Sequence, residues 1–104
     1  MQQSVHFASI GILIFIKPTP LYVAVGDTVT FYADDDKEYE IVIPNKDKFF
    51  VSVDGATIEE TATSAESPTT PAVNNKPPNT PKFYSVTVGG SGITNSPPRI
   101  IIGS

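Results

Sequence analysis

The sequence predicts an all-β fold, a two-sheet Greek-key β-sandwich of six or seven short strands. Segments rich in Val, Ile, Thr and aromatic residues alternate between apolar and polar positions, which favours strands. Ten prolines and seven glycines interrupt the chain at intervals too short for long helices. The length of 104 residues suits a single domain, residues 1–104, with one hydrophobic core.

The amino-terminal stretch from Val5 to Ile16 is predicted to be extended and buried. Residues 12–16 are apolar at every position, which indicates a strand covered on both faces. The motif Lys17-Pro18-Thr19-Pro20 ends this stretch, because proline holds the preceding residue in extended backbone and cannot continue a regular ladder.

Three alternating segments follow, at Leu21–Val25, Thr28–Ala33 and Tyr39–Ile43. Their odd-numbered residues are apolar and are expected to face the core, because side chains alternate between the two faces of a strand. The pair Gly26-Asp27 predicts the turn between the first two segments, and Pro44 stops the third.

Phe49–Val53 is a further predicted strand, closed by Asp54-Gly55, a pair typical of hairpin turns. Neighbouring residues of a strand point to opposite faces. A strand here would therefore place one ring of the pair Phe49 and Phe50 on the surface.

Residues Thr61 to Lys82 have the composition of a long exposed loop, with five prolines, seven Ser or Thr and few large apolar residues. A loop of this kind is expected to be mobile unless other segments hold it. The two P-x-x-P spacings at 68–71 and 78–81 lack a flanking Arg, so a solvated loop is favoured over a polyproline ligand. Strand patterning resumes at Phe83–Val88 and, after a glycine-rich loop, at Arg99–Ile102.

Composition and charge exclude several classes of function. A net charge of −4 without a cluster of Lys and Arg argues against nucleic-acid binding. The absence of cysteine excludes disulfides and thiolate metal sites. The apolar run at 11–16 is far shorter than the roughly 20 residues of a spanning helix, so no membrane insertion is expected. We also see no basic segment typical of a signal peptide.

The residues favour no catalytic site, and we predict that the protein is not an enzyme and binds no cofactor. His6, the one imidazole, is expected at the surface or a strand end without a catalytic partner. Glu59 and Glu60 would point to opposite faces of a strand and could not share a substrate. The acidic run Asp34–Glu38 lacks the spacing of a calcium loop, and Gly89–Gly92 lacks the lysine of a phosphate loop.

The segment LYVAVGDTVTF at residues 21–31, followed by a polar loop and by EIVIP at residues 40–44, resembles the cupredoxin family, the plastocyanin-like blue-copper sandwiches. Tyr84–Val88 is similar to the family's Y-x-F/Y-x-C segment, and Arg99–Ile102 to its closing strand. The resemblance implies a cupredoxin-like fold. An immunoglobulin-like sandwich is the alternative, although the chain has neither the cysteines nor the tryptophan of that fold.

Blue-copper sites use a thiolate, two imidazoles and a weak axial thioether. The resemblance places Tyr39 and Ser91 at the two histidine positions, Val88 at the cysteine position and Ser96 at the methionine position. None of these side chains suits blue copper. The resemblance therefore implies a domain without a metal and without electron transfer.

We predict a metal-free cupredoxin-like binding or protein-interaction module. The family docks partners at its copper end, which points to the loops at 35–39 and 89–96. The candidate interaction residues are Asp35, Asp36, Tyr39, Phe50 and Ile93.

The partner is expected to be a protein. Ten of the eleven acidic residues lie between Asp27 and Glu60, an asymmetry that suits a basic partner or self-association. Alternatives are a self-associating structural or surface protein, and a small carbohydrate- or ligand-binding sandwich with Tyr22, Tyr32 or Phe50 as a stacking platform. Only the family resemblance suggests a compartment, the periplasm or the cell exterior.

Overall fold

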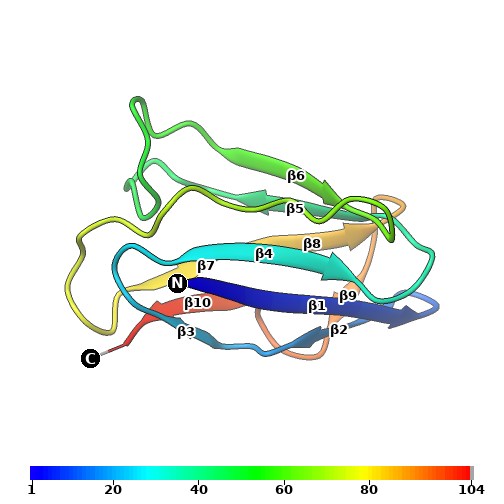
Figure 1. Ribbon diagram of the computed structural model, residues 1–104. Helices are drawn as coiled ribbons and strands as arrows, with labels where there is room; N and C mark the ends of the chain where they lie inside the picture. Colours follow the sequence, from blue (N-terminus) through cyan, green and yellow to red (C-terminus); the bar gives the residue numbers. More distant parts are fainter. Residues whose placement is uncertain (104) are drawn as a thin grey trace.

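The computed structural model describes residues 1–103. Across these residues the regular elements are strands (Figure 1). The ten strands are β1 (Gln2–Ile10), β2 (Leu13–Lys17), β3 (Leu21–Val23), β4 (Thr28–Ala33), β5 (Tyr39–Ile43), β6 (Ile58–Ala62), β7 (Pro81–Phe83), β8 (Ser85–Val88), β9 (Ile93–Thr94) and β10 (Arg99–Ile102). No helix in the described part of the chain is long and apolar enough to cross a membrane.

The strands form two layers. One layer is the sheet β4-β1-β2-β9, in which β1 pairs antiparallel with β2 and parallel with β4. The other consists of the sheets β6-β5-β8 and β3-β10-β7, which are joined because β7 and β8 follow one another with only Tyr84 between them. The chain passes from the first layer to the second between β2 and β3, at the predicted break around Pro18 and Pro20.

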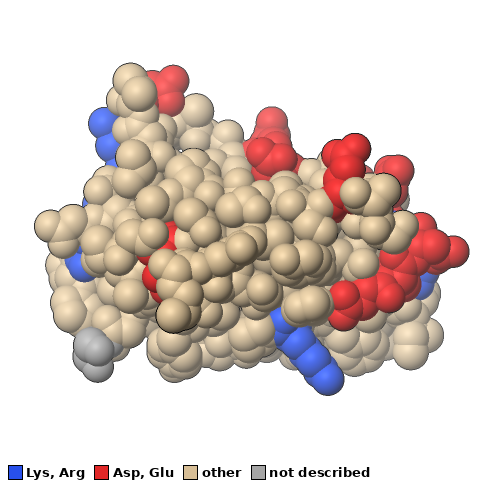
Figure 2. Space-filling view, in the orientation of Figure 1, with Lys and Arg blue, Asp and Glu red and all other residues tan. Residues whose placement is uncertain are grey.

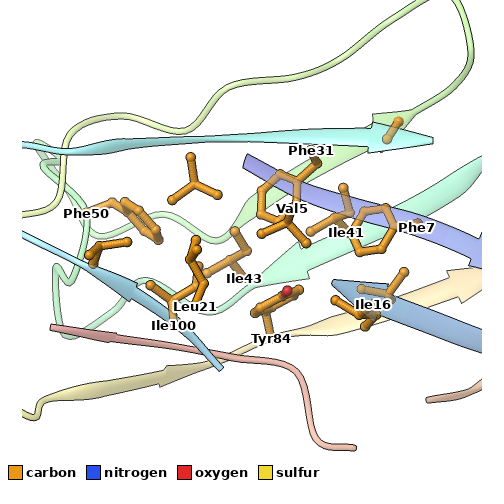
Figure 3. Packing of buried hydrophobic residues seen from close by; sticks show 14 of the residues in the cluster. Val5, Phe7, Ile16, Leu21, Phe31, Ile41, Ile43, Phe50, Tyr84 and Ile100 are labelled. Atoms are coloured by element: carbon orange, nitrogen blue, oxygen red, sulfur yellow. The ribbon is translucent and has the colours of Figure 1, made fainter. Parts of the chain in front are cut away.

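The core lies between the two layers and draws on both (Figure 3). The ring of Phe7 in β1 stacks on Phe31 in β4 and on Tyr39 in β5, with centroid distances of 5.7 and 5.3 Å. The odd-numbered residues of β3 and β5 are buried, as predicted, and so are Val29 and Phe31 in β4. Val25 is exposed, because β3 ends at Val23.

The Gly26-Asp27 turn joins β3 to β4 and is also bonded to β1 through Asp27. Asp27 is buried, and its carboxylate accepts hydrogen bonds from the backbone N–H of Ala24 at 2.9 Å and from the side-chain amide of Gln3 at 3.0 Å. The β3–β4 turn is thereby fixed to β1. A short acceptor side chain at this place explains why an aspartate follows the glycine.

The stretch from Val5 to Ile16 is a hairpin and not one buried strand. β1 turns at Gly11, where φ is +59°, and returns as β2. Leu13 and Phe15 are exposed on the outer face, whereas Ile14 and Ile16 are buried. One apolar face of β2 therefore packs in the core, and the other apolar face is exposed. The sequence pattern alone does not distinguish an exposed apolar face from a buried one.

The prediction of a strand at Phe49–Val53 is wrong. Both phenylalanine rings are buried, so neither lies on the surface as a strand would require. The side chain of Asn45 accepts a hydrogen bond from the backbone N–H of Phe50 at 2.9 Å and donates one to its carbonyl at 3.1 Å. Phe50 forms only an isolated bridge, with Val73. Asn45 therefore replaces a strand partner, and the irregular backbone allows adjacent rings to turn the same way.

The predicted loop from Thr61 to Lys82 is largely exposed but is held at many points. β6, which the sequence did not predict, extends into its beginning as an edge strand beside β5. Residues 68–73 then run along β4, where the N–H of Phe31 donates to the carbonyl of Pro68 and the N–H of Thr70 to that of Val29. Lys82 closes the segment with an ion pair to Asp47, at 2.8 Å. Prolines suit such an edge because they need no ladder partner.

The hydroxyl of Tyr84 gives a test of the core. It is buried without a hydrogen-bond partner among residues 1–103, and burial raises its pKa well above the ordinary tyrosine value. Because an unpaired buried hydroxyl costs free energy, we expect Tyr84→Phe to raise the free energy of unfolding by about 1 kcal/mol. Urea denaturation measures the change, with Tyr22→Phe on the exposed face of β3 as the matched control. A loss of stability in Tyr84→Phe alone would contradict this packing.

Candidate functional site

Three connections meet at one end of the sandwich. They are the β1–β2 turn at residues 11–12, the β4–β5 connection at residues 34–38 and the β8–β9 connection at residues 89–92, which we call together the hairpin end (Figure 1). The backbone N–H of Ile93 donates to the carbonyl of Ile12 at 2.7 Å, so the first and third connections are in contact. The middle connection is fixed to the end of β1 by side chains.

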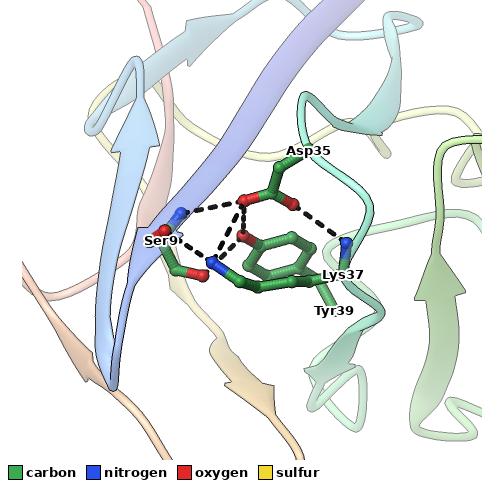
Figure 4. A network of polar contacts seen from close by, with 4 residues as sticks. All are labelled: Ser9, Asp35, Lys37 and Tyr39. Carbon is green, nitrogen blue, oxygen red and sulfur yellow. Dashed lines mark hydrogen bonds and ion pairs between the residues drawn. The ribbon is translucent and has the colours of Figure 1, made fainter.

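A network of polar contacts around Tyr39 closes the interior of this end (Figure 4). Tyr39 is fully buried, and its hydroxyl donates to Asp35 Oδ2 at 2.8 Å. The Oγ of Ser9 lies 2.9 Å from the same hydroxyl. Lys37 Nζ donates to the carbonyl of Ser9 at 2.7 Å and lies 3.7 Å from the Asp35 carboxylate. The ring of Tyr39 fills the core, and its hydroxyl has hydrogen-bond partners in Asp35 and Ser9.

The Asp35 carboxylate is the centre of this network. It also accepts hydrogen bonds from the backbone N–H of Ser9, at 3.1 Å, and of Lys37, at 3.2 Å. Burial acts to raise the pKa of Asp35, but the hydrogen bonds from Tyr39, Lys37 and Ser9 and the charge of Lys37 outweigh burial and hold the pKa below the ordinary aspartate value. Burial, together with the negative charges of Asp35 and Asp34, raises the pKa of Tyr39 to about 12 despite the contact with Ser9.

The structure brings together three of the four positions that the resemblance assigned to copper ligands. Tyr39 at the start of β5 is the register partner of Val88 at the end of β8, and Val88 pairs with Ser91 across a tight turn. Ser96 lies farther along, in the connection between β9 and β10.

The two layers and the loops at this end define a cupredoxin-like β-sandwich, which confirms the predicted fold class. Among solved structures, a proline-to-glycine mutant of amicyanin, a cupredoxin, in its reduced Cu(I) form at pH 4 is similar, with a TM-score of 0.64 and 12% sequence identity. The similarity covers 97% of this chain and 81% of the amicyanin chain. At this identity it establishes the fold alone. No protein-family model and no curated protein matches the sequence.

The residues present do not fit a blue-copper centre. The chain has no cysteine, and the hydroxyl at the first imidazole position, that of Tyr39, is engaged by Asp35 and Ser9. The single histidine, His6, lies on the outer face of β1 and contacts Asp34. Residues 1–103 contain no group of three or more His, Cys, Asp or Glu side chains placed to hold a metal ion.

The outside of the hairpin end is apolar and lies next to acidic residues. Ile10, Ile12, Leu13 and Ile93 have exposed fractions between 48% and 74%. Leu13 pairs with Ile10 across the hairpin and with Ile93 in β9, and Ile12 is joined to Ile93 by a backbone hydrogen bond, so the four residues are neighbours. Figure 2 shows acidic side chains gathered over the β4–β5 connection at the same end, where Asp36 and Glu38 are exposed. We call these six residues the hairpin-end surface.

Some of the predicted interaction residues are exposed and others are buried. Asp36 and Ile93 are exposed. Tyr39 and Phe50 are fully buried instead. Asp35 is mostly turned inward, with 24% of its side chain exposed, and is occupied by the Tyr39 network. The exposed isoleucines at 10 and 12 were missed because the sequence placed them in one buried strand.

Two further expectations change. His6 is not without a partner: its Nδ1–H donates to Asp34 Oδ1 at 2.8 Å, and its ring stacks on Tyr32 at 4.9 Å. This contact joins residues 28 positions apart, so only the parallel pairing of β1 with β4 reveals it. Of the three alternative stacking residues, Phe50 is ruled out because it is buried, whereas Tyr22 is exposed and the ring of Tyr32 is stacked on His6.

The Tyr39 hydroxyl is expected to stabilise the fold through a charge-assisted contact. Tyr39→Phe leaves the ring in place but takes a donor from Asp35, so the free energy of unfolding should fall by about 1.5–3 kcal/mol at pH 7. Because the pKa of Asp35 is lowered in the folded protein, this contribution is complete above the ordinary aspartate pKa and is lost as the pH falls through the folded value.

Urea denaturation of wild type and Tyr39→Phe at neutral and acid pH measures the difference. Tyr22→Phe, whose side chain is exposed, serves as the control and should change stability little at either pH. An equal effect of Tyr39→Phe at both pH values would contradict the coupling to Asp35.

Proposed function

We propose that this chain is a metal-free cupredoxin-like protein-interaction module that binds a partner protein through the hairpin-end surface. The observation that carries the proposal is the contiguous exposure of four large aliphatic side chains, Ile10, Ile12, Leu13 and Ile93, at one end of the sandwich. Clustered apolar exposure of this kind is typical of protein interfaces. The domain acts by binding and carries out no catalysis or electron transfer.

The position of the Tyr39 network supports this role. It holds the β4–β5 connection against Ser9, directly beside the exposed Ile10. The surface therefore needs little reorganisation to bind, and less conformational entropy is lost on association.

The charge next to the apolar cluster indicates the kind of partner. Asp36 and Glu38 are exposed on the β4–β5 connection at the same end of the sandwich. An interface with an apolar centre and a charged rim gains association rate from opposite charge on the partner. We therefore propose a partner with apolar residues framed by Lys or Arg. A second copy of this chain is the alternative, since apolar edges also favour self-association.

Substitution at Ile93 tests the proposal. Ile93→Asp places a charge in the apolar cluster, so the retention of a specific partner from an extract of the source cells should fall about tenfold or more. The matched control is Val53→Asp, which adds the same charge at a residue that is 97% exposed in the connection after β5, at the opposite end of that strand. It should retain the partner as wild type does.

Equal retention by wild type, Ile93→Asp and Val53→Asp would contradict the proposed surface. Urea denaturation verifies that both variants fold. Sedimentation equilibrium of the purified protein distinguishes the alternative, because self-association would raise the molar mass of wild type and Val53→Asp but not of Ile93→Asp.

A further inference from the structure

The outer face of the β1–β2 hairpin carries a hollow that borders the hairpin-end surface but shares no residue with it. His6 pairs with Lys17, and Ala8 pairs with Phe15 in the next outward-facing row. Residues two apart on a strand project from the same face, so the four side chains form a square. Ala8 is much smaller than the other three, and its short side chain leaves a depression in the surface.

The resulting cavity, the β1–β2 hollow, has a volume of about 340 Å³ and is lined by His6, Phe7, Ala8, Phe15, Lys17 and Asp34. This size falls within the range of small-molecule sites, roughly 300–1,000 Å³. Its walls are mainly apolar, with the partly exposed ring of Phe15 on the β2 side. A flat hydrophobic group is the complement of such a wall.

One wall of the hollow is fixed in place. The imidazole of His6 is stacked on Tyr32 with an interplanar angle of 17°, and its Nδ1–H donates to Asp34 at 2.8 Å. The ring is thus held both by stacking and by a hydrogen bond at its edge. A wall held this way presents its shape before any ligand arrives.

The charged groups around the hollow indicate the charge of its ligand. No carboxylate among residues 1–103 lies within ion-pair distance of Lys17, so its ammonium group is available. Asp34 is engaged by His6. It follows β4, and β1 lies between β4 and β2, the strand that carries Lys17. Asp34 lines the same hollow, so the anion is expected at the β2 side with Lys17, while the Asp34 carboxylate stays on His6.

We propose that the β1–β2 hollow binds small aromatic carboxylates. The ring lies over Ala8 against Phe15 and His6, and the carboxylate pairs with Lys17. This site shares no residue with the hairpin-end surface, although Ile10 and Leu13 of that surface form the next outward-facing row beyond Ala8 and Phe15, and its proposal does not rest on the protein partner proposed above.

Amide chemical shifts of the isotope-labelled protein, followed during titration with benzoate, test the site. We expect saturable shifts at His6, Ala8, Phe15 and Lys17 with a dissociation constant on the order of 1–10 mM, as for other very small ligands. Benzyl alcohol, which has the ring without the charge, and cyclohexanecarboxylate, which has the charge without the flat ring, should each bind at least threefold more weakly.

Variants separate this site from general adsorption. Ala8→Leu fills the hollow with an apolar side chain and should abolish the shifts, while urea denaturation verifies the fold. Lys17→Gln should weaken benzoate about threefold to fivefold, as expected for one exposed ion pair, whereas Lys76→Gln should not.

A second apolar hollow, lined by Val42, Pro44, Phe83, Tyr84 and Ser85 and without a charged group, is an internal control. Benzoate shifts of equal size there, unchanged binding in Ala8→Leu, or equal affinity for benzyl alcohol would each overturn the proposal.

Discussion

The buried hydroxyl of Tyr39 imposes the constraint on which the hairpin end depends. The ring is needed in the core, where it packs on Phe7, but its hydroxyl has no access to water. A buried hydroxyl without a partner costs free energy, so the chain must deliver polar groups to this point. Asp35 does so, and Lys37 balances the charge of that carboxylate. The β4–β5 connection therefore lies against the end of β1 and has a defined shape, although its sequence is short and highly charged.

The Tyr39 network holds the loops of a cupredoxin-like sandwich by hydrogen bonds and an ion pair instead of by metal ligands. In a blue-copper protein, metal ligands tie the loops of this end together. Here Tyr39 and Val88 meet in the same register, yet hydrogen bonds and an ion pair hold the loops. The outer surface of the end can then present Ile10, Ile12 and Ile93 as a contact area. Under the proposed function, the same fold supplies a rigid platform for binding through side chains that have no role in the core.

Local patterns were sufficient for most of the fold and for little of the site. The alternation in β4 and β5 identified their core faces, because one side of each strand is buried and the period of two is visible. Phe49 and Phe50 were misread because Asn45 satisfies the backbone of Phe50, a contact that a pattern does not report. β6 was missed because its edge position leaves Glu59 and Glu60 exposed and removes the apolar alternation. The contacts of Tyr39 with Ser9 and of His6 with Asp34 join residues about 30 positions apart, and only the topology brings them together.

The most direct test is the titration of the Asp35 side-chain carboxyl, followed by ¹³C NMR of the folded protein. If Asp35 accepts hydrogen bonds from Tyr39, Ser9 and Lys37 beside the Lys37 charge, its pKa must lie below the ordinary aspartate value, even though burial acts to raise it. In Tyr39→Phe the pKa should move upward, while the exposed Asp36 should titrate identically in both proteins. A pKa for Asp35 at or above the ordinary value, or one that does not respond to Tyr39→Phe, would contradict the closure of the hairpin end by this network.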